Sequence, residues 1–341
     1  MNESLLDLLK ATSRSFHLTL RVLPGAIRPQ IGLAYLLART ADTIADTEVV
    51  PPARRLEALQ RLRGRISGEN AKPVAFGELA EEQATPGEQL LLESVEESVA
   101  LMETFSTEDQ RLVRAALETI TSGQELDLQR FADSSRDKIV ALRTGTELDD
   151  YTYRVAGCVG EFWTKICRAH LFPHAAVDDA RLLANGVRFG KGLQLVNILR
   201  DLPVDLRKGR CYLPGDELSK IGLSPSDLLE PANENRVRPL YGRWLDLAQS
   251  HLEAGWVYTN SLPSSQRRVR LACAWPILIG ARTISRLRTG RVLDAGRRIK
   301  VPRQEVRRIL LRSVLCYPLP GVWQKQFDFH VKAVASGGDL A

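Results

Sequence analysis

Two aspartates one helical turn apart, Asp42 and Asp46, have the residue type and spacing of a metal-binding pair. With Tyr35 and Arg39 they are spaced four, three and four residues apart, so on an α-helix all four side chains project from one face. Two such carboxylates repel each other in a low-dielectric cleft unless a cation lies between them. Hard oxygen ligands favour Mg²⁺, with Mn²⁺ as a substitute, although an isolated DxxxD is more typical of a solvated helix face.

A second polar stripe occurs in the segment GLQLVNILRDLPVDLR, where Gln194, Asn197, Asp201 and Asp205 are spaced three, four and four residues apart. Apolar residues surround the stripe, and a fully solvated helix would expose them. Burial makes paired charge costly without a counter-ion, so two matching stripes favour a metal site. Pro203 removes a backbone donor, and we expect the helix to kink or end near it, with Asp205 placed less securely than Asp201.

Helical periodicity dominates the 341 residues, and no series of alternating apolar and polar stretches predicts a sheet. The chain is therefore predicted to be all-α. No internal repeat is evident, so we expect one domain over residues 1–341, with 336–341 as a loose tail. Thr107 and Thr146 each precede an acidic or amide residue by three positions and are predicted helix N-caps.

Several classes of protein are disfavoured by composition. The longest apolar run, 271–281, falls short of the roughly 20 residues that a transmembrane helix needs, and Glu3 and Asp7 interrupt the pattern of a signal peptide. Five cysteines without CxxC spacing predict thiols in a reducing cytoplasm rather than a zinc site. The net charge of +6 is compatible with nucleic acid, an anionic membrane face or a phosphate-bearing substrate.

The order of these motifs resembles the squalene and phytoene synthase family of head-to-head prenyl synthases over most of the chain. Besides the two stripes, the resemblance rests on TSRSF at 12–16, YTYRVAGCVG at 151–160 and GRCYLP at 209–214. It implies one antiparallel helical bundle of the isoprenoid synthase type around a central cavity. The two aspartate motifs are then expected on opposite walls, where they bind magnesium and the diphosphate of farnesyl or geranylgeranyl diphosphate.

The resemblance also implies roles for individual residues. Metal and diphosphate positions are matched by Asp42, Asp46, Asn197, Asp201 and Asp205. Positions near the substrate's phosphates are matched by Ser13, Arg14, Ser15, Arg39, Arg200 and Arg210. The reacting centre is matched by Phe16, Tyr35, Tyr151 and Gln194. Ala45 and Val204 depart from the family pattern, which often has an acidic residue there, and this implies either fewer metal ligands or a different occupancy of the metal sites.

These residue types suit the ionisation of an allylic diphosphate. Magnesium and arginine stabilise the leaving anion where its charge develops. Aromatic faces attract the carbocation without acting as nucleophiles, which suits Phe16, Tyr35 and Tyr151. Tyr151 is our candidate for guiding proton loss or rearrangement of the cation.

The final step divides the family. Squalene synthases quench the second cation with hydride from NADPH, whereas phytoene and dehydrosqualene synthases lose a proton and need no cofactor. The only GxG, at 190–192, lies in a predicted helix and is no Rossmann fingerprint. Ten Lys or Arg lie between Arg286 and Arg312. They predict either a seat for cofactor phosphates, with Arg200, Arg210 and Lys300 as candidates, or contact with an anionic membrane.

The segment LACAWPILIGARTISRL, together with GRCYLP, looks closest to bacterial soluble members described as squalene synthases. We therefore expect squalene made from two farnesyl diphosphates through presqualene diphosphate, with phytoene or dehydrosqualene synthesis as the alternative. Two non-enzyme alternatives are a basic helical module for nucleic acid, which the aspartate stripes disfavour, and an assembly factor that has lost its metal ligands. The sequence indicates no particular oligomeric state.

Overall fold

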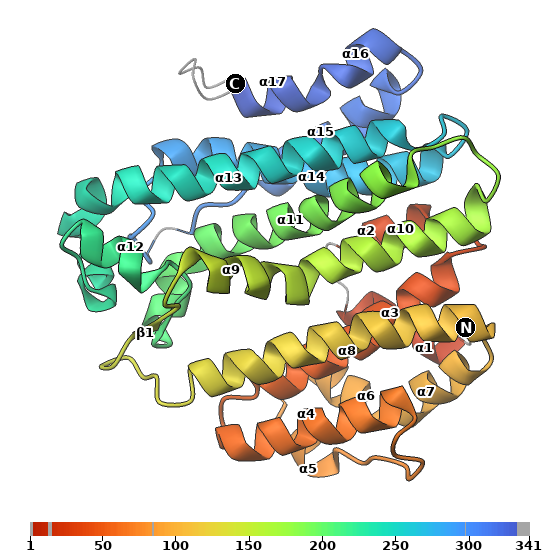
Figure 1. Ribbon diagram of the computed structural model, residues 1–341, viewed down its shortest axis with the longest axis horizontal. Helices are drawn as coiled ribbons and strands as arrows, with labels where there is room; N and C mark the ends of the chain where they lie inside the picture. Colours follow the sequence, from red (N-terminus) through yellow and green to blue (C-terminus); the bar gives the residue numbers. More distant parts are fainter. Residues whose placement is uncertain (1–2, 13–15, 84, 297, 333–341) are drawn as a thin grey trace. The chain divides into compact units, whose positions relative to one another are not determined.

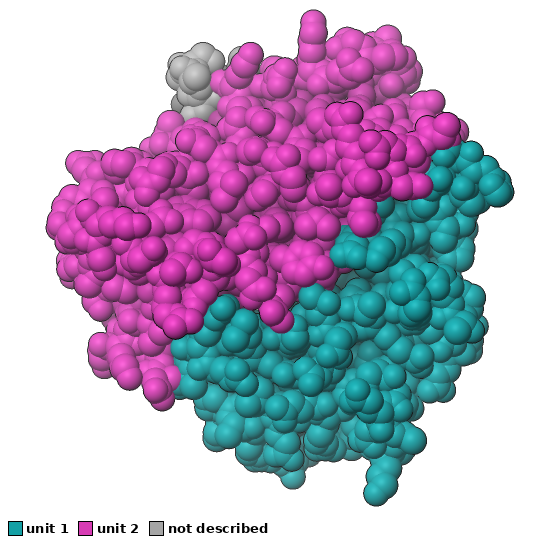
Figure 2. All heavy atoms as spheres, viewed as in Figure 1, with its two compact units in different colours: residues 1–132, 161–175 teal, residues 133–160, 176–341 magenta. Residues whose placement is uncertain are grey.

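The computed structural model describes residues 3–12, 16–83, 85–296 and 298–332, which are almost entirely helical (Figure 1). The prediction of an all-α chain is confirmed. The chain divides into two compact units, each with its own buried apolar residues: unit 1 comprises residues 1–132 and 161–175, and unit 2 comprises 133–160 and 176–341 (Figure 2). Within the described residues, no helix combines the length and apolarity that crossing a membrane requires.

Unit 1 is built around α3 (Arg28–Asp46) and α8 (Thr107–Arg130), which pack against each other. Buried apolar side chains on α3 recur at helical spacing, as Leu33, Leu37 and Ile44 show, so one side of this helix faces the core. The remaining helices of this unit are α1 (Glu3–Thr12), α2 (Phe16–Val22), α4 (Pro52–Ser67), α5 (Gly77–Glu81), α6 (Pro86–Glu93), α7 (Val95–Glu103) and the larger part of α10 (Cys158–Leu171).

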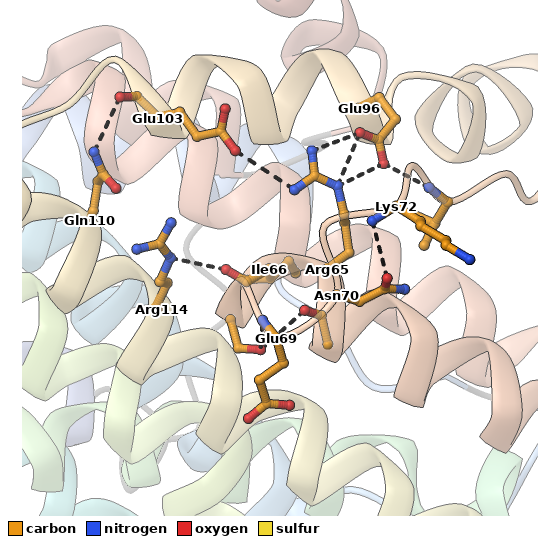
Figure 3. Close-up of polar contacts among 12 residues, drawn as sticks. Arg65, Ile66, Glu69, Asn70, Lys72, Glu96, Glu103, Gln110 and Arg114 are labelled. Atoms are coloured by element: carbon orange, nitrogen blue, oxygen red, sulfur yellow. Dashed lines mark hydrogen bonds and ion pairs between the residues drawn. The ribbon is translucent and has the colours of Figure 1, made fainter.

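The C-terminal end of α4 is tied to α7 and α8 by a polar network (Figure 3). Arg65 donates to both oxygens of Glu96, whose Oε1 also accepts from the backbone N–H of Val74 at 2.9 Å. Arg114 of α8 donates to the carbonyl of Ile66 at 3.0 Å, one of the carbonyls that a helix end leaves without an intrahelical partner. The network therefore fixes α4 against α7 and α8.

Unit 2 is centred on α11 (Asp179–Arg207), which packs against α13 (Glu234–Ser261) and α14 (Arg267–Thr289). The other elements of this unit are β1 (Val140–Ala141), α9 (Gly145–Thr152), the π-helix η1 (Tyr153–Gly157), β2 (Arg210–Cys211), α12 (Gly215–Lys220), the 3₁₀ turns η2 (Pro225–Leu229) and η3 (Pro231–Asn233), α15 (Arg303–Cys316), α16 (Pro320–Gln324) and α17 (Gln326–Lys332). The two strands pair in parallel, with Val140 opposite Arg210.

Glycines let η1 and the start of α10 approach α11 closely. A Cβ at Gly160 would overlap the carbonyl of Gly186, and one at Gly190 would overlap the carbonyl of Ala156. Gly192 faces His251 and Leu252 of α13 in the same way, with a Cβ contact of 2.9 Å to the His251 Cβ. The GxG at 190–192 therefore allows close packing of α11 against η1 and α13.

Both predicted N-caps were wrong by one or two residues. Ser106, not Thr107, caps α8 and accepts from the N–H of Asp109 at 3.1 Å. Thr144, not Thr146, caps α9 and accepts from the N–H of Glu147. Each true cap also precedes an acidic residue by three positions, so the sequence pattern offered two overlapping choices at each helix start.

Candidate active site

The side of α3 that is not packed into the core of unit 1 carries the first predicted stripe. Tyr35, Arg39 and Asp42 are partly exposed and Asp46 is exposed, while the residues between them are mostly buried. The Tyr35 hydroxyl donates to the carbonyl of Thr12 at 3.2 Å, which ties α3 to the end of α1. These four side chains therefore share one accessible face of one helix.

Asp42 is a carboxylate with little positive charge beside it. Gln124 of α8 donates a short hydrogen bond to its Oδ1, and Arg39 Nη1 lies 4.0 Å from its Oδ2. Arg39 is occupied elsewhere, since its Nη2 donates to Glu88 Oε1 at 2.9 Å. Burial by the surrounding protein, followed by the negative charge of Asp46, raises the pKa of Asp42 to about 6. The Asp42 side chain still keeps 49% of its surface accessible, so a cation from solvent can reach it.

Asp42 and Asp46 carry the oxygen donors that Mg²⁺ prefers. In the described residues, no three His, Cys, Asp or Glu side chains gather closely enough to hold a metal by themselves. Mg²⁺ in proteins commonly uses one or two carboxylates and completes its shell with water and substrate phosphates. Asp42 and Asp46 fit that donor set, because they are two carboxylates one turn apart, and both burial and the charge of Asp46 raise the pKa of Asp42, which a nearby cation would lower.

The second predicted stripe lies on the less buried side of α11. Gln194, Asp201 and Asp205 are partly exposed and Asn197 is exposed. Of the two outcomes expected at Pro203, a kink or an end of the helix, the end is wrong, because α11 continues through this residue to Arg207. Asp205 therefore lies on the same helix as Asp201, one turn further on.

A tyrosine from α13 makes this continuation feasible. Because proline has no N–H, Pro203 leaves the carbonyl of Leu199 without its usual helical partner. The hydroxyl of Tyr241 donates to that carbonyl at 2.8 Å. Tyr241 is fully buried, and burial raises the pKa of its hydroxyl, so it remains a donor. Tyr241 was not predicted as a functional residue, because nothing in the sequence around it indicates this role.

Asp201 has the opposite electrostatic setting to Asp42. Arg200 donates to both of its oxygens, at 3.0 and 2.5 Å, and Arg298 donates to Oδ1 at 2.9 Å. Burial alone would raise the pKa of Asp201, but the two guanidinium groups outweigh burial and lower it. Arg298 was not predicted as a site residue. Lys300, two residues further along the chain, is exposed, so Arg200, Arg298 and Lys300 belong to one basic region of unit 2.

Tyr151 stacks on Tyr212 inside unit 2. Their ring centroids lie 5.0 Å apart at 23°, and their hydroxyl oxygens are 3.5 Å apart. Tyr212 belongs to the GRCYLP motif, which also contains Arg210 on β2, but this tyrosine was not among the predicted site residues. The motif itself was the signal, since its aromatic residue follows directly after the strand that pairs with β1.

Four predicted residues belong to the TSRSF motif near the N-terminus. Phe16 is the first residue of α2. Ser13, Arg14 and Ser15 lie outside the described residues.

A cavity of about 230 Å³ between α4 and α8 contains none of the predicted site residues among its described lining, which consists of Arg63, Ile66, Ser67, Arg114, Ala115, Leu117, Glu118 and Thr121.

Comparison with known proteins gives matches over most of the chain. A family model described as squalene/phytoene synthase matches residues 9–305. A bifunctional lycopene cyclase/phytoene synthase of Leptosphaeria maculans is 30% identical over 292 residues, which cover 85% of this chain and 47% of that protein. The chain thus spans about half the length of the curated relatives that it matches first.

Solved structures with the same fold include a complex of TcSQS with the ligand E5700. It has a TM-score of 0.79 and 22% identity, and the match covers 99% of this chain and 94% of that one. A dehydrosqualene synthase in complex with a ligand has a TM-score of 0.64 and 20% identity, covering 92% and 95%. At these identities the likeness shows the fold: the described helices have the architecture of the isoprenoid synthases.

Proposed function

Because the chain belongs to the squalene/phytoene synthase family, we propose that it joins two prenyl diphosphates head to head after ionising them with a divalent metal. The observation that carries the proposal is the carboxylate pair on α3, in which burial and then the charge of Asp46 raise the pKa of Asp42 to about 6 although Arg39 lies 4.0 Å away. A raised pKa that comes from burial and a neighbouring carboxylate is more typical of a functional site than of a solvated helix face. The resemblance stated from the motifs is the same family that the comparisons identify.

In this proposal Asp42 and Asp46 hold Mg²⁺ by their carboxylate oxygens, and Asn197, Asp201 and Asp205 supply the ligands of the second motif. When bound, the metal neutralises the diphosphate and stabilises its departure as a leaving group. Gln124 supports metal binding indirectly, because its hydrogen bond orients the Asp42 carboxylate.

The arginines beside the second motif bind phosphate oxygens. Arg200 and Arg298 hold Asp201 in the absence of substrate, and a diphosphate offers both guanidinium groups a more highly charged acceptor. Arg39 and Arg210 serve the same purpose, as do Ser13, Arg14 and Ser15 of the TSRSF motif. Each guanidinium adds charge-assisted hydrogen bonds where negative charge develops on the leaving group.

Aromatic side chains protect the carbocation from water. The stacked pair of Tyr151 and Tyr212 offers π-faces and a hydroxyl that can accept or relay a proton. Phe16, Tyr35 and Gln194 complete the surroundings of the reacting carbon atoms.

The specific product that we propose is squalene, made from farnesyl diphosphate through presqualene diphosphate. The support is the likeness of GRCYLP and LACAWPILIGARTISRL to bacterial squalene synthases. NADPH would supply the hydride, and the basic region of Arg200, Arg298 and Lys300 has the charge to hold its phosphates. The second candidate, phytoene or dehydrosqualene synthesis without a reductant, is favoured by the name of the relative at 30% identity.

Incubation of the full chain with farnesyl diphosphate and Mg²⁺, with and without NADPH, tests the proposal by mass analysis of the extracted lipid. Squalene that appears only with NADPH supports it. Dehydrosqualene, or phytoene from geranylgeranyl diphosphate, would replace the specific product and keep the reaction class. No product from either substrate, with metal supplied, would favour an assembly factor or a binding module.

We propose in addition that the two units form one functional domain in a cytoplasmic enzyme. The family model runs through both units, from residue 9 to 305. All five cysteines are free thiols, which suits a reducing compartment. Limited proteolysis tests the single domain: cleavage that releases an independently active fragment would contradict it.

A further inference from the structure

The outer surface of α15, α16 and α17 carries large apolar side chains where a solvated helix carries polar ones. Leu311 and Leu315 are 61% and 65% exposed. Of the thirteen large apolar residues that are most exposed in the described chain, six lie in this short stretch, and we call them the C-terminal apolar surface: Leu311, Val314, Leu315, Leu319, Val322 and Phe329. Clustered exposure of this kind marks an interaction site rather than scattered surface residues.

The contacts on the inner face of α15 hold these side chains outward. Ser313 is fully buried and accepts a hydrogen bond from Trp275 Nε1 at 2.9 Å. Glu305 accepts from Arg282 and, at 2.6 Å, from Arg286, both on α14. These contacts fix the rotation of α15 about its axis. Turning its apolar outer face inward would break all of them, so the exposure is built into the packing.

Positive charge accompanies the apolar side chains. Arg307 and Arg308 lie one turn before Leu311 on the exposed face of α15, and in the described part of the chain neither forms an ion pair. Residues 302–332 contain six Lys or Arg and only two acidic residues, and one of these, Glu305, is already neutralised by two arginines. The surface is therefore both apolar and cationic.

We propose that the C-terminal apolar surface docks onto an anionic lipid bilayer. Helices that lie in the membrane interface combine an apolar face with Lys and Arg that reach lipid phosphates. A second copy of this chain suits the surface less well, because an isologous dimer would bring the same arginines together. Nucleic acid would satisfy the arginines but would leave Leu311 and Leu315 without apolar contacts.

Docking would place α15 along the bilayer plane. Leu311, Val314 and Leu315 would enter the boundary between headgroups and acyl chains, and Arg307 and Arg308 would contact lipid phosphates. Arg312 is already stacked over the ring of Phe329, with its guanidinium carbon 3.8 Å from the ring centroid. That pair adds an aromatic and a cation at the same surface. The proposal does not depend on which reaction the protein catalyses.

Flotation of the full chain with vesicles tests the docking without substrate. We expect binding to phosphatidylcholine vesicles that contain phosphatidylglycerol, and much weaker binding to phosphatidylcholine alone. The double variant Leu311→Gln/Leu315→Gln should weaken binding by more than about tenfold through lost apolar burial. Arg307→Gln/Arg308→Gln should weaken binding to the anionic vesicles by roughly thirtyfold and leave the weak binding to neutral vesicles unchanged.

Matched controls separate this surface from general exposure and charge. Leu247→Gln/Val257→Gln removes two exposed apolar side chains of α13, and Arg267→Gln/Arg268→Gln removes two exposed arginines of α14. Both controls should bind anionic vesicles like the wild type, and all variants should keep the wild-type melting temperature. Equal losses in the controls, equal binding to neutral vesicles, or no vesicle binding would overturn the proposal. A dimer that Leu311→Gln/Leu315→Gln converts to a monomer, with vesicle binding unchanged, would assign the surface to a second copy instead.

Discussion

The aspartates of α3 and those of α11 have the same spacing but opposite electrostatic surroundings. Asp42 has a pKa raised to about 6 by burial and by Asp46, whereas Asp201 has a lowered pKa because Arg200 and Arg298 outweigh its burial. The two motifs are therefore not electrostatically equivalent. The α3 pair gains most from a cation, while the α11 pair already has cations that a diphosphate could draw away.

Replacing either central aspartate by asparagine should produce the largest effect. Asp42→Asn and Asp201→Asn each keep the side-chain shape and remove a metal ligand, so turnover should fall by roughly a thousandfold or more. Product formation at saturating Mg²⁺ measures this loss, and circular dichroism checks that the helices remain. Glu108→Gln and Asp246→Asn, which change exposed carboxylates outside the stripes, should retain activity. If only one aspartate variant lost activity, the other motif would not be part of the catalytic site.

Removing the Tyr241 hydroxyl should damage the α11 motif alone. Tyr241→Phe leaves the buried carbonyl of Leu199 without a partner, which costs about 1 to 3 kcal/mol of stability. The helix around Pro203 then loses the hydrogen bond that stabilises it, so Asp201 and Asp205 are held less firmly and turnover should fall. Magnesium binding by Asp42 and Asp46 should persist. Chemical denaturation gives the free energy of unfolding. Tyr258→Phe is the matched control, another fully buried tyrosine on α13, and it should not reduce turnover.

The local part of this comparison could be predicted from the sequence, and the long-range part could not. Helical spacing placed each stripe on one face because it depends only on residues a few positions apart. Some of the partners that set the pKa values are local, as Asp46 and Arg200 are. Others lie much farther away in the chain: Gln124 is 82 residues from Asp42, and Arg298 is 97 residues from Asp201. No periodicity of the sequence reveals such contacts.

Pro203 shows how a correct local rule can mislead. Proline does remove a donor, yet α11 continues, because Tyr241, 42 residues from Leu199, satisfies the carbonyl that proline leaves open. The cap residues were missed for the opposite reason. There the capping pattern was local but matched two neighbouring residues, since Ser106 and Thr107 both precede an acidic or amide residue by three positions. Tertiary packing decided the first case, and one hydrogen bond decided the second.

The two aspartates should also respond to pH in opposite directions in the metal-free protein. Asp42 binds its proton more tightly in the folded than in the unfolded protein, so the free energy of unfolding falls as pH rises from about 4 to about 6. Above that range Asp42 causes no further loss of stability. Asp201 has a lowered folded pKa, so it contributes stability above the ordinary aspartate range that is lost as pH falls below it. At neutral pH, Asp42→Asn should therefore raise the melting temperature and Asp201→Asn should lower it. Near pH 4 the stabilisation by Asp42→Asn should vanish. Melting curves that shift in the same direction for both variants at neutral pH would contradict the contrast.

The smallest expected effect comes from Arg298, whose ion pair with Asp201 is more than half exposed on the arginine side. Exposed pairs contribute little, so Arg298→Gln should change the Mg²⁺ concentration for half-maximal activity by up to about fivefold. The direction is informative. If Arg298 mainly compensates Asp201, its loss leaves a more negative carboxylate and lowers the metal requirement. If it mainly binds diphosphate, the KM for farnesyl diphosphate rises and the metal requirement stays the same. Arg291→Gln, which changes an exposed arginine nearby in the chain, should alter neither value. A change in only one of the two values, seen in Arg298→Gln and not in this control, therefore identifies whether the Arg298 guanidinium contacts Asp201 or the diphosphate during turnover.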